Sequence, residues 1–206
     1  MKKNDKNIAV VCNGKMPKDK TLINQIKSAN YVIAVDGAGN TLFDLNITPN
    51  VIIGDFDSIN PISDEEIKFI QTKDQSKTDF RKTLEWCIEN NILEISIYGI
   101  SGKNDDHFLG NYYTLSDFIE KISWKAFTDF SIISPCKGTR EFQSYKGQKV
   151  SIFSMKGSSI VNSENLEYPL ESYRLQPSDE AVRNISFSSQ FIITSTNAIL
   201  VFQSRK

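Results

Sequence analysis

The chain has 206 residues, of which 39% are hydrophobic, and its 24 basic and 25 acidic side chains leave a net charge of −1. This length suits one large domain or two small ones, and the charge balance argues against a nucleic-acid-binding protein, because such domains are usually strongly basic. The single histidine, His107, excludes a zinc site built on two or three histidines. We therefore expect any metal to be held by carboxylates.

The cysteines and the apolar runs indicate where the protein works. Cys12, Cys87 and Cys136 are odd in number and widely spaced, as in a reduced cytoplasmic protein rather than a disulfide framework. No apolar run approaches the roughly 20 residues of a membrane-spanning helix, and the run Ile8–Cys12 is too short for a signal peptide. We expect a cytoplasmic protein without a membrane partner.

Up to about residue 135, short apolar runs alternate with stretches of helical periodicity. The runs are almost continuously apolar, as in strands buried on both faces of a parallel sheet, and they cover 8–12, 31–35, 51–53, 95–98 and 130–133. Helices are expected at 19–28, 39–46, 63–70, 78–90 and 106–122. In the helix over 78–90, Phe80, Leu84 and Cys87 share one face, and Thr78 stands at the N-cap position. This alternation predicts an α/β fold with a Rossmann-like, mostly parallel sheet flanked by helices.

The character of the sequence changes after Pro135. Helical periodicity disappears, serine becomes frequent, and short alternating segments are separated by turn residues such as Lys146-Gly147. We therefore divide the chain into an α/β domain, residues 1–135, and an all-β domain, residues 136–206. The second is small, so we expect it to pack on the first domain or on a second subunit.

Four loops of the α/β part are rich in aspartate, glycine and asparagine, and three of them follow predicted strands, where parallel sheets bind ligands. The first, Asp36-Gly37-Ala38-Gly39-Asn40, opens a helix. Its small residues would let backbone N–H groups approach a phosphate. A structural turn in which Asp36 caps the helix explains the pattern at least as well.

The second loop, Gly54-Asp55-Phe56-Asp57-Ser58, is more specific. Positions two apart in an extended segment point the same way, so Asp55 and Asp57 would face one side while Phe56 anchors the other. Two carboxylates held this close repel each other unless a cation lies between them, and Mg²⁺ accepts this arrangement beside substrate phosphates. A solvated acidic turn is the alternative.

The remaining two loops add carboxylates, cations and the histidine. The third carries Asp74 and Asp79, and it places three cations where phosphate oxygens could be neutralised, although solvated helix charges explain them equally well: Lys77, Arg81 and Lys82. In the fourth, 99–111, His107 and Asn111 are four apart and would share one helical face. The glycine-rich Walker pattern and a nucleophilic Ser, Cys or His arrangement are both absent from the sequence. The four loops together favour phosphoryl or nucleotidyl transfer, in which catalysis is positioning and charge neutralisation.

At these residues the sequence resembles the thiamine pyrophosphokinase (thiamin diphosphokinase) family. The family's elements D-G-G-A-N-x-L, G-D-x-D-S, T-D-x-x-K-A-L and D-H-x-x-x-N correspond to residues 36–42, 54–58, 78–84 and 106–111. Its later elements correspond to 165–170 and Arg183-Asn184. The sequence departs from the pattern at three places: Gly102-Lys103-Asn104 stands for G-G-R, Ser76 occupies a place that is often acidic, and Arg183-Asn184 stands for S-N.

The resemblance implies an N-terminal domain that binds ATP and Mg²⁺, a C-terminal β-sandwich-like domain that binds thiamine, and a homodimer. Thiamine would lie between the α/β part of one subunit and the β part of the other. The implied reaction transfers the pyrophosphoryl group of ATP to the hydroxyethyl group of thiamine, giving thiamine diphosphate and AMP. Two alternatives stay open: a related pyrophosphokinase acting on another alcohol, such as a hydroxymethylpterin, and a non-catalytic nucleotide-binding module.

The same resemblance assigns roles to individual residues. Asp55, Asp57 and Asp79 would be the catalytic carboxylates, and together with Asp74 they would bind Mg²⁺. The nucleotide and active-site pocket would be formed by Asp36, Gly37, Asn40, Ser58, Thr78, Lys82, Gly102, Asp106, His107 and Asn111. Tyr168 and Asn184 fall where the family contacts thiamine.

Overall fold

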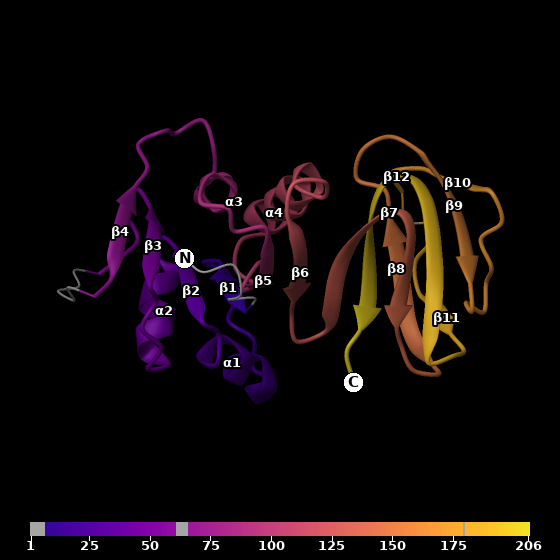
Figure 1. Ribbon diagram of the computed structural model, residues 1–206, viewed down its shortest axis with the longest axis horizontal. Coiled ribbons are helices and arrows are strands. Elements are labelled where there is room, and N and C mark those ends of the chain that lie inside the picture. Colours follow the sequence, from indigo (N-terminus) through magenta and orange to yellow (C-terminus); the bar gives the residue numbers. More distant parts are fainter. Residues whose placement is uncertain (1–6, 61–65, 179) are drawn as a thin grey trace. The chain divides into compact units, whose positions relative to one another are not determined.

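The computed structural model describes residues 7–60, 66–178 and 180–206 (Figure 1). The chain forms two compact units. The first unit runs to Thr114 and includes Glu120–Asp129, and the second unit consists of Leu115–Ile119 and Phe130–Lys206. Among the described helices, none has the length and apolar character needed to cross a lipid bilayer.

The first unit is built on a parallel sheet. Its strands are β1 (Ile8–Val11), β2 (Tyr31–Val35), β3 (Val51–Gly54), β4 (Lys68–Gln71), β5 (Glu94–Tyr98) and β6 (Ser123–Phe127). They lie side by side in the order β6-β5-β1-β2-β3-β4, and every pairing between neighbours is parallel (Figure 1). β1, β2 and β3 are buried almost throughout, which confirms the prediction that the continuous apolar runs are interior strands.

Helices bury both faces of this sheet. Alternate strand residues such as Ala9 and Val32 pack in one cluster with apolar side chains of α1 (Lys20–Lys27) and α2 (Ala38–Asp44). The intervening strand residues point to the opposite face, where α3 (Asp79–Glu89) contacts β2 and β3. The Thr78 side chain accepts a hydrogen bond from the Arg81 N–H, so the predicted N-cap of α3 is confirmed. The remaining helix is α4 (Asp105–Asp117).

Two predicted elements of this region are wrong. The expected helix over 63–70 lies partly outside the described residues, and where the chain is described it forms β4, an edge strand paired only with β3. A short apolar run does not distinguish a strand from a helix by periodicity. The strand expected at 130–133 in the parallel sheet is the start of β7 (Ser131–Gln143), which pairs antiparallel in the second unit. The strand that pairs with β5 in the parallel sheet is β6, which the sequence did not predict because its residues alternate between buried and exposed and form no continuous apolar run.

The described part of the second unit beyond residue 130 consists of antiparallel strands. β12 (Gln190–Ser204) pairs with β7 along most of its length. The first half of β12 also pairs with β9 (Ser159–Glu164), and its second half pairs with β8 (Gln148–Phe153). The short strands β10 (Tyr173–Leu175) and β11 (Asn184–Ser186) pair with β9 and β8. Inward-facing side chains such as Phe142, Phe191 and Val201 form a core of this unit's own.

Candidate active site

A pocket of about 410 Å³ opens in the first unit, where the loops after β1, β2, β3 and β5 meet the start of α3 and α4. This is the edge at which the parallel strands end, the place where such sheets bind ligands. Nine of the residues to which the resemblance assigns a role lie at the wall of this pocket: Asp36, Asp55, Asp57, Ser58, Thr78, Asp79, Lys82, His107 and Asn111. Lys77 lies there too.

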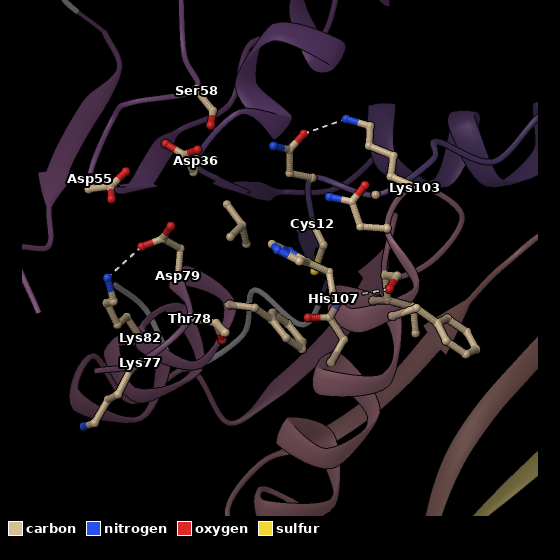
Figure 2. Close-up of a pocket in the computed structure, with 18 of the residues that line it drawn as sticks. Cys12, Asp36, Asp55, Ser58, Lys77, Thr78, Asp79, Lys82, Lys103 and His107 are labelled. Atoms are coloured by element: carbon tan, nitrogen blue, oxygen red, sulfur yellow. Dashed lines mark hydrogen bonds and ion pairs between the residues drawn. The ribbon is translucent and has the colours of Figure 1, made fainter. Parts of the chain in front are cut away.

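Three carboxylates form the centre of the pocket's acidic side. Asp36, Asp55 and Asp79 each offer one oxygen, and these oxygens lie within 4.8 Å of one another. Figure 2 shows the three side chains turned toward the same space. They come from the ends of β2 and β3 and from the first residue of α3, so parts of the chain far apart in sequence build the cluster.

The backbone around Asp36 is shaped to hold this carboxylate inside. Asp36 is buried and has a φ of +43°, an uncommon conformation that Asp tolerates better than most residues. The Phe56 N–H donates to its Oδ1 at 3.2 Å, and Gly54 leaves room beside it, since a Cβ on Gly54 would lie 2.6 Å from the Asp36 Cβ. Burial raises the pKa of the Asp36 carboxyl above its usual value.

The loop after β3 differs from the extended segment that the sequence suggested. Phe56 has a φ of +69°, and the Asp57 N–H turns back to donate to Asp55 Oδ1 at 3.2 Å. The segment is therefore a turn rather than an extended strand end, and Asp36 and Asp79 join Asp55 in the close cluster. Asp57 still lines the pocket, and its Oδ1 accepts a hydrogen bond from Ser58 Oγ at 2.7 Å. Phe56 anchors the loop on the core, as expected.

Lys82 supplies a buried positive charge beside the cluster. Its Nζ lies 2.8 Å from Asp79 Oδ1 and 3.3 Å from Thr72 Oγ1, and the side chain is only 8% exposed. On the outer side, Gln75 Nε2 donates to Asp55 Oδ2 at 3.1 Å, and this hydrogen bond lowers the pKa of the Asp55 carboxyl. The three carboxylates are thus only partly compensated by the chain itself.

The opposite side of the pocket carries different chemistry. Figure 2 shows His107 and Lys103 across the pocket from Asp55 and Asp79. Lys103 Nζ donates to Asn13 Oδ1 at 2.8 Å, which holds the lysine at the wall of the pocket. Asn111 Nδ2 donates to the Ile100 carbonyl at 2.8 Å and so ties α4 to the loop after β5. His107 and Asn111 both line the pocket from α4.

Other residues singled out in the sequence do not line the pocket: Gly37, Asn40, Asp74, Gly102 and Asp106. Asn40 braces the loop after β3, because its Nδ2 donates to the Ser58 carbonyl at 2.8 Å and its Oδ1 accepts from the Asn60 N–H at 2.9 Å. Asp74 closes a turn of its own by accepting hydrogen bonds from the Ser76 N–H and Oγ, at 2.8 and 2.6 Å. Its exposed carboxylate lies outside the described cluster.

In the second unit, Asn184 holds Tyr168. The Asn184 Nδ2 donates to the Tyr168 carbonyl at 2.6 Å, and its Oδ1 accepts from the Tyr168 N–H at 3.0 Å and from the Ile185 N–H at 2.8 Å. Asn184 is buried, whereas Tyr168 is 62% exposed. The two residues expected to contact thiamine are therefore hydrogen-bonded neighbours. The Asn184 amide makes hydrogen bonds to the protein backbone, and the Tyr168 side chain is exposed.

Several residues that line the pocket were not predicted as site residues from the sequence, notably Asn13, Gln75, Ile100 and Phe108. Asn13-Gly14 could have been found, because this dipeptide is a turn signal directly after the first strand, at the ligand-binding edge. Gln75, Ile100 and Phe108 carry no such signal, since their types and spacing fit an ordinary loop or helix.

The fold and the pocket together define an α/β protein with an acidic ligand site at the carboxyl edge of a parallel sheet. Comparison with models of protein families shows which family of this class the chain belongs to. The model described as "Thiamin pyrophosphokinase, catalytic domain" matches residues 22–127, and "Thiamin pyrophosphokinase, substrate-binding domain" matches residues 131–202. The chain belongs to the thiamin pyrophosphokinase family, which confirms the resemblance found in the sequence.

Two individual relatives with matching segments carry the family's name. The chain is 32% identical over 103 residues to thiamin pyrophosphokinase 1 of Caenorhabditis elegans, covering 45% of this chain and 42% of the relative. It is 36% identical over 89 residues to thiamine pyrophosphokinase of Bacillus subtilis, covering 40% of this chain and 42% of the relative. The matched segment thus spans less than half of each of these curated relatives. The solved structure of the Bacillus subtilis enzyme superposes with a TM-score of 0.80 at 23% identity, over 97% of this chain and 98% of that one, which supports the fold.

Proposed function

We propose that this protein transfers the pyrophosphoryl group of ATP to the hydroxyethyl oxygen of thiamine, giving thiamine diphosphate and AMP. The observation that carries the proposal is the Asp36, Asp55 and Asp79 cluster with its buried Lys82, in a chain that matches both domain models of the family. Residues 1–135, with a Rossmann-like sheet, would form the ATP-binding catalytic domain. Residues 136–206 would form a β-sandwich-like, thiamine-binding domain.

The donor set fits Mg²⁺. Carboxylate oxygens are the ligands that this hard cation prefers, and three of them within 4.8 Å carry more negative charge than Lys82 alone offsets. We assign the metal to Asp36, Asp55 and Asp79, with Asp57 near enough to line the same pocket. Asp74, expected as a ligand from the sequence, lies outside the described cluster. Bound Mg²⁺ would neutralise phosphate oxygens and stabilise the charge that develops during transfer.

The residues of the chain then divide the work of an in-line transfer. The thiamine oxygen attacks the β-phosphorus of ATP, the bond to the oxygen bridging the α- and β-phosphates breaks, and AMP leaves with that oxygen. The alcohol proton passes to a carboxylate of the pocket or to solvent. Lys82 holds Asp79 in place, and Lys103 offers its charge to the phosphates from the other wall. Positioning and charge neutralisation supply the catalysis.

For the whole assembly we infer a cytoplasmic homodimer, in which thiamine lies between the α/β part of one subunit and the β part of the other. Tyr168, presented outward by Asn184, would contact the thiamine ring. Light scattering combined with the activity assay tests this arrangement. A strictly monomeric particle that is fully active would contradict a shared thiamine site.

The decisive experiment is an AMP-release assay with purified protein, ATP and Mg²⁺, and with either thiamine or a hydroxymethylpterin as acceptor. We expect AMP release with thiamine alone. Release with the pterin alone would assign the chain to a related pyrophosphokinase. ATP binding without release in either mixture would indicate a non-catalytic nucleotide-binding module.

A further inference from the structure

Phe108 is an aromatic side chain whose position the proposed chemistry does not explain. It lies on the first turns of α4 beside His107, lines the pocket, and is 41% exposed. An exposed phenylalanine costs the hydrophobic stabilisation that burial would give. Of the exposed large hydrophobic side chains in the described part of the chain, Phe108 is the one that lines the pocket.

The ring is held in place although it is exposed. Phe108 packs edge-on against Tyr112, one helical turn further along α4, with ring centroids 4.8 Å apart and planes at 73°. Tyr112 itself is 7% exposed, so Phe108 leans on a fixed support. An aromatic ring that is oriented before a ligand arrives loses little conformational entropy on binding.

The pocket offers both charged and apolar groups to a ligand. The carboxylates and Lys82 come from the β2 and β3 ends and from α3. α4 contributes Phe108 together with His107 and Asn111, and the buried side chains of Ile100 and of Phe80, which lies on α3, also line the pocket. A ligand with a charged phosphate part and a planar ring could place the phosphates near the carboxylates and the ring against α4.

We propose that Phe108 is a stacking platform for the planar nitrogen heterocycle of a substrate bound in this pocket. The inference rests on the proposed function for its choice of ligands, since ATP carries such a ring in adenine and thiamine carries one in its pyrimidine. Stacking of a base on an aromatic side chain changes affinity by roughly tenfold when the ring is removed. Phe108 is thus a specificity-determining residue that stacks on the ring, while the carboxylates, through Mg²⁺, and the lysines bind the phosphates.

The test compares Phe108→Ala with Leu109→Ala. Leu109 is the adjacent residue of α4 and is 53% exposed, but it is not among the residues that line the pocket. Equilibrium binding is measured by calorimetry for three probes, each with Mg²⁺ present: ATP, inorganic tripolyphosphate and thiamine. Circular dichroism verifies that both variants are folded, and Phe108→Tyr, which keeps a ring, serves as the conservative variant.

We expect Phe108→Ala to weaken either ATP or thiamine binding by roughly tenfold, while tripolyphosphate binding and the Leu109→Ala protein stay unchanged. A loss for ATP assigns the platform to adenine, and a loss for thiamine assigns it to the pyrimidine. Phe108→Tyr should bind as the parent chain does. Unchanged affinity for both ring-bearing ligands, an equal loss for tripolyphosphate, or an equal loss in Leu109→Ala would overturn the proposal. Because binding is measured without turnover, a chain that stacks ATP but releases no AMP would refute the proposed function and leave the platform standing.

Discussion

Replacing Asn184 by alanine removes a side chain that grips both backbone polar groups of Tyr168. The loss comprises the hydrogen bonds to the Tyr168 carbonyl at 2.6 Å, from the Tyr168 N–H at 3.0 Å and from the Ile185 N–H at 2.8 Å. At about 1 kcal/mol net for each hydrogen bond, the free energy of unfolding should fall by about 3 kcal/mol. The backbone groups left behind are part-buried, so water compensates them incompletely.

Denaturant unfolding followed by circular dichroism measures this loss, and Asn162→Ala is the matched control. Asn162 is also an asparagine of the second unit, but it is exposed and its Oδ1 accepts one hydrogen bond, from the Ser172 N–H at 2.8 Å. Its replacement should cost about 1 kcal/mol or less. In an activity assay, Asn184→Ala should raise the KM for thiamine more than the KM for ATP. A loss below 1 kcal/mol in Asn184→Ala, or an equal loss in Asn162→Ala, would refute the reasoning that the amide positions Tyr168.

Three further predictions concern the first unit. Asn has nearly the shape of Asp and tolerates the positive φ, so Asp36→Asn should fold. It should lose Mg²⁺-dependent turnover by orders of magnitude, because it removes one carboxylate of the cluster. Turnover of the control Asp44→Asn, at an exposed aspartate, should be unchanged in the same assay. Gly54→Ala should weaken Mg²⁺ binding in calorimetry, because its Cβ would displace the adjacent Asp36 carboxylate. In Gly110→Ala the new Cβ would meet open space inside α4, so the free energy of unfolding should rise by about 0.5–1 kcal/mol. The three cysteines are buried, and burial raises the pKa of Cys87 to about 12, so a thiol reagent at pH 8 should label the protein only after denaturation; fast labelling of the native chain would contradict this.

The interior of the parallel sheet could be predicted from the sequence, and its edges could not. β1, β2 and β3 are buried on both faces, so their residues are continuously apolar and the pattern is unambiguous. β4 and β6 each have one neighbour in the parallel sheet, and their exposed positions carry polar residues such as Lys68 and Lys125. Mixed patterns of four or five residues do not separate edge strands from helices or loops.

The acidic pocket was also partly predictable. Its aspartates stand after strands, and the topology of a parallel sheet alone brings such positions together. The sequence could not show the local backbone: Asp36 and Phe56 both have a positive φ, and Asp36 joins Asp55 and Asp79 in the cluster. Asn184 illustrates the same limit, because only the structure shows that its amide is used within the chain.

The position of β1 inside the sheet has a consequence for how the chain folds as it is synthesised. One edge of β1 pairs with β2, which follows closely, through contacts such as Ile8 with Tyr31. Its other edge pairs with β5 through Ala9 with Ser96, so it stays open until β5 has left the ribosome. An open strand edge is a template for pairing with other chains, and such distant parallel pairings form slowly. Because the pocket draws its walls from both sides of β1, a ligand that contacts both walls can stabilise the nascent chain only once β5 is in place.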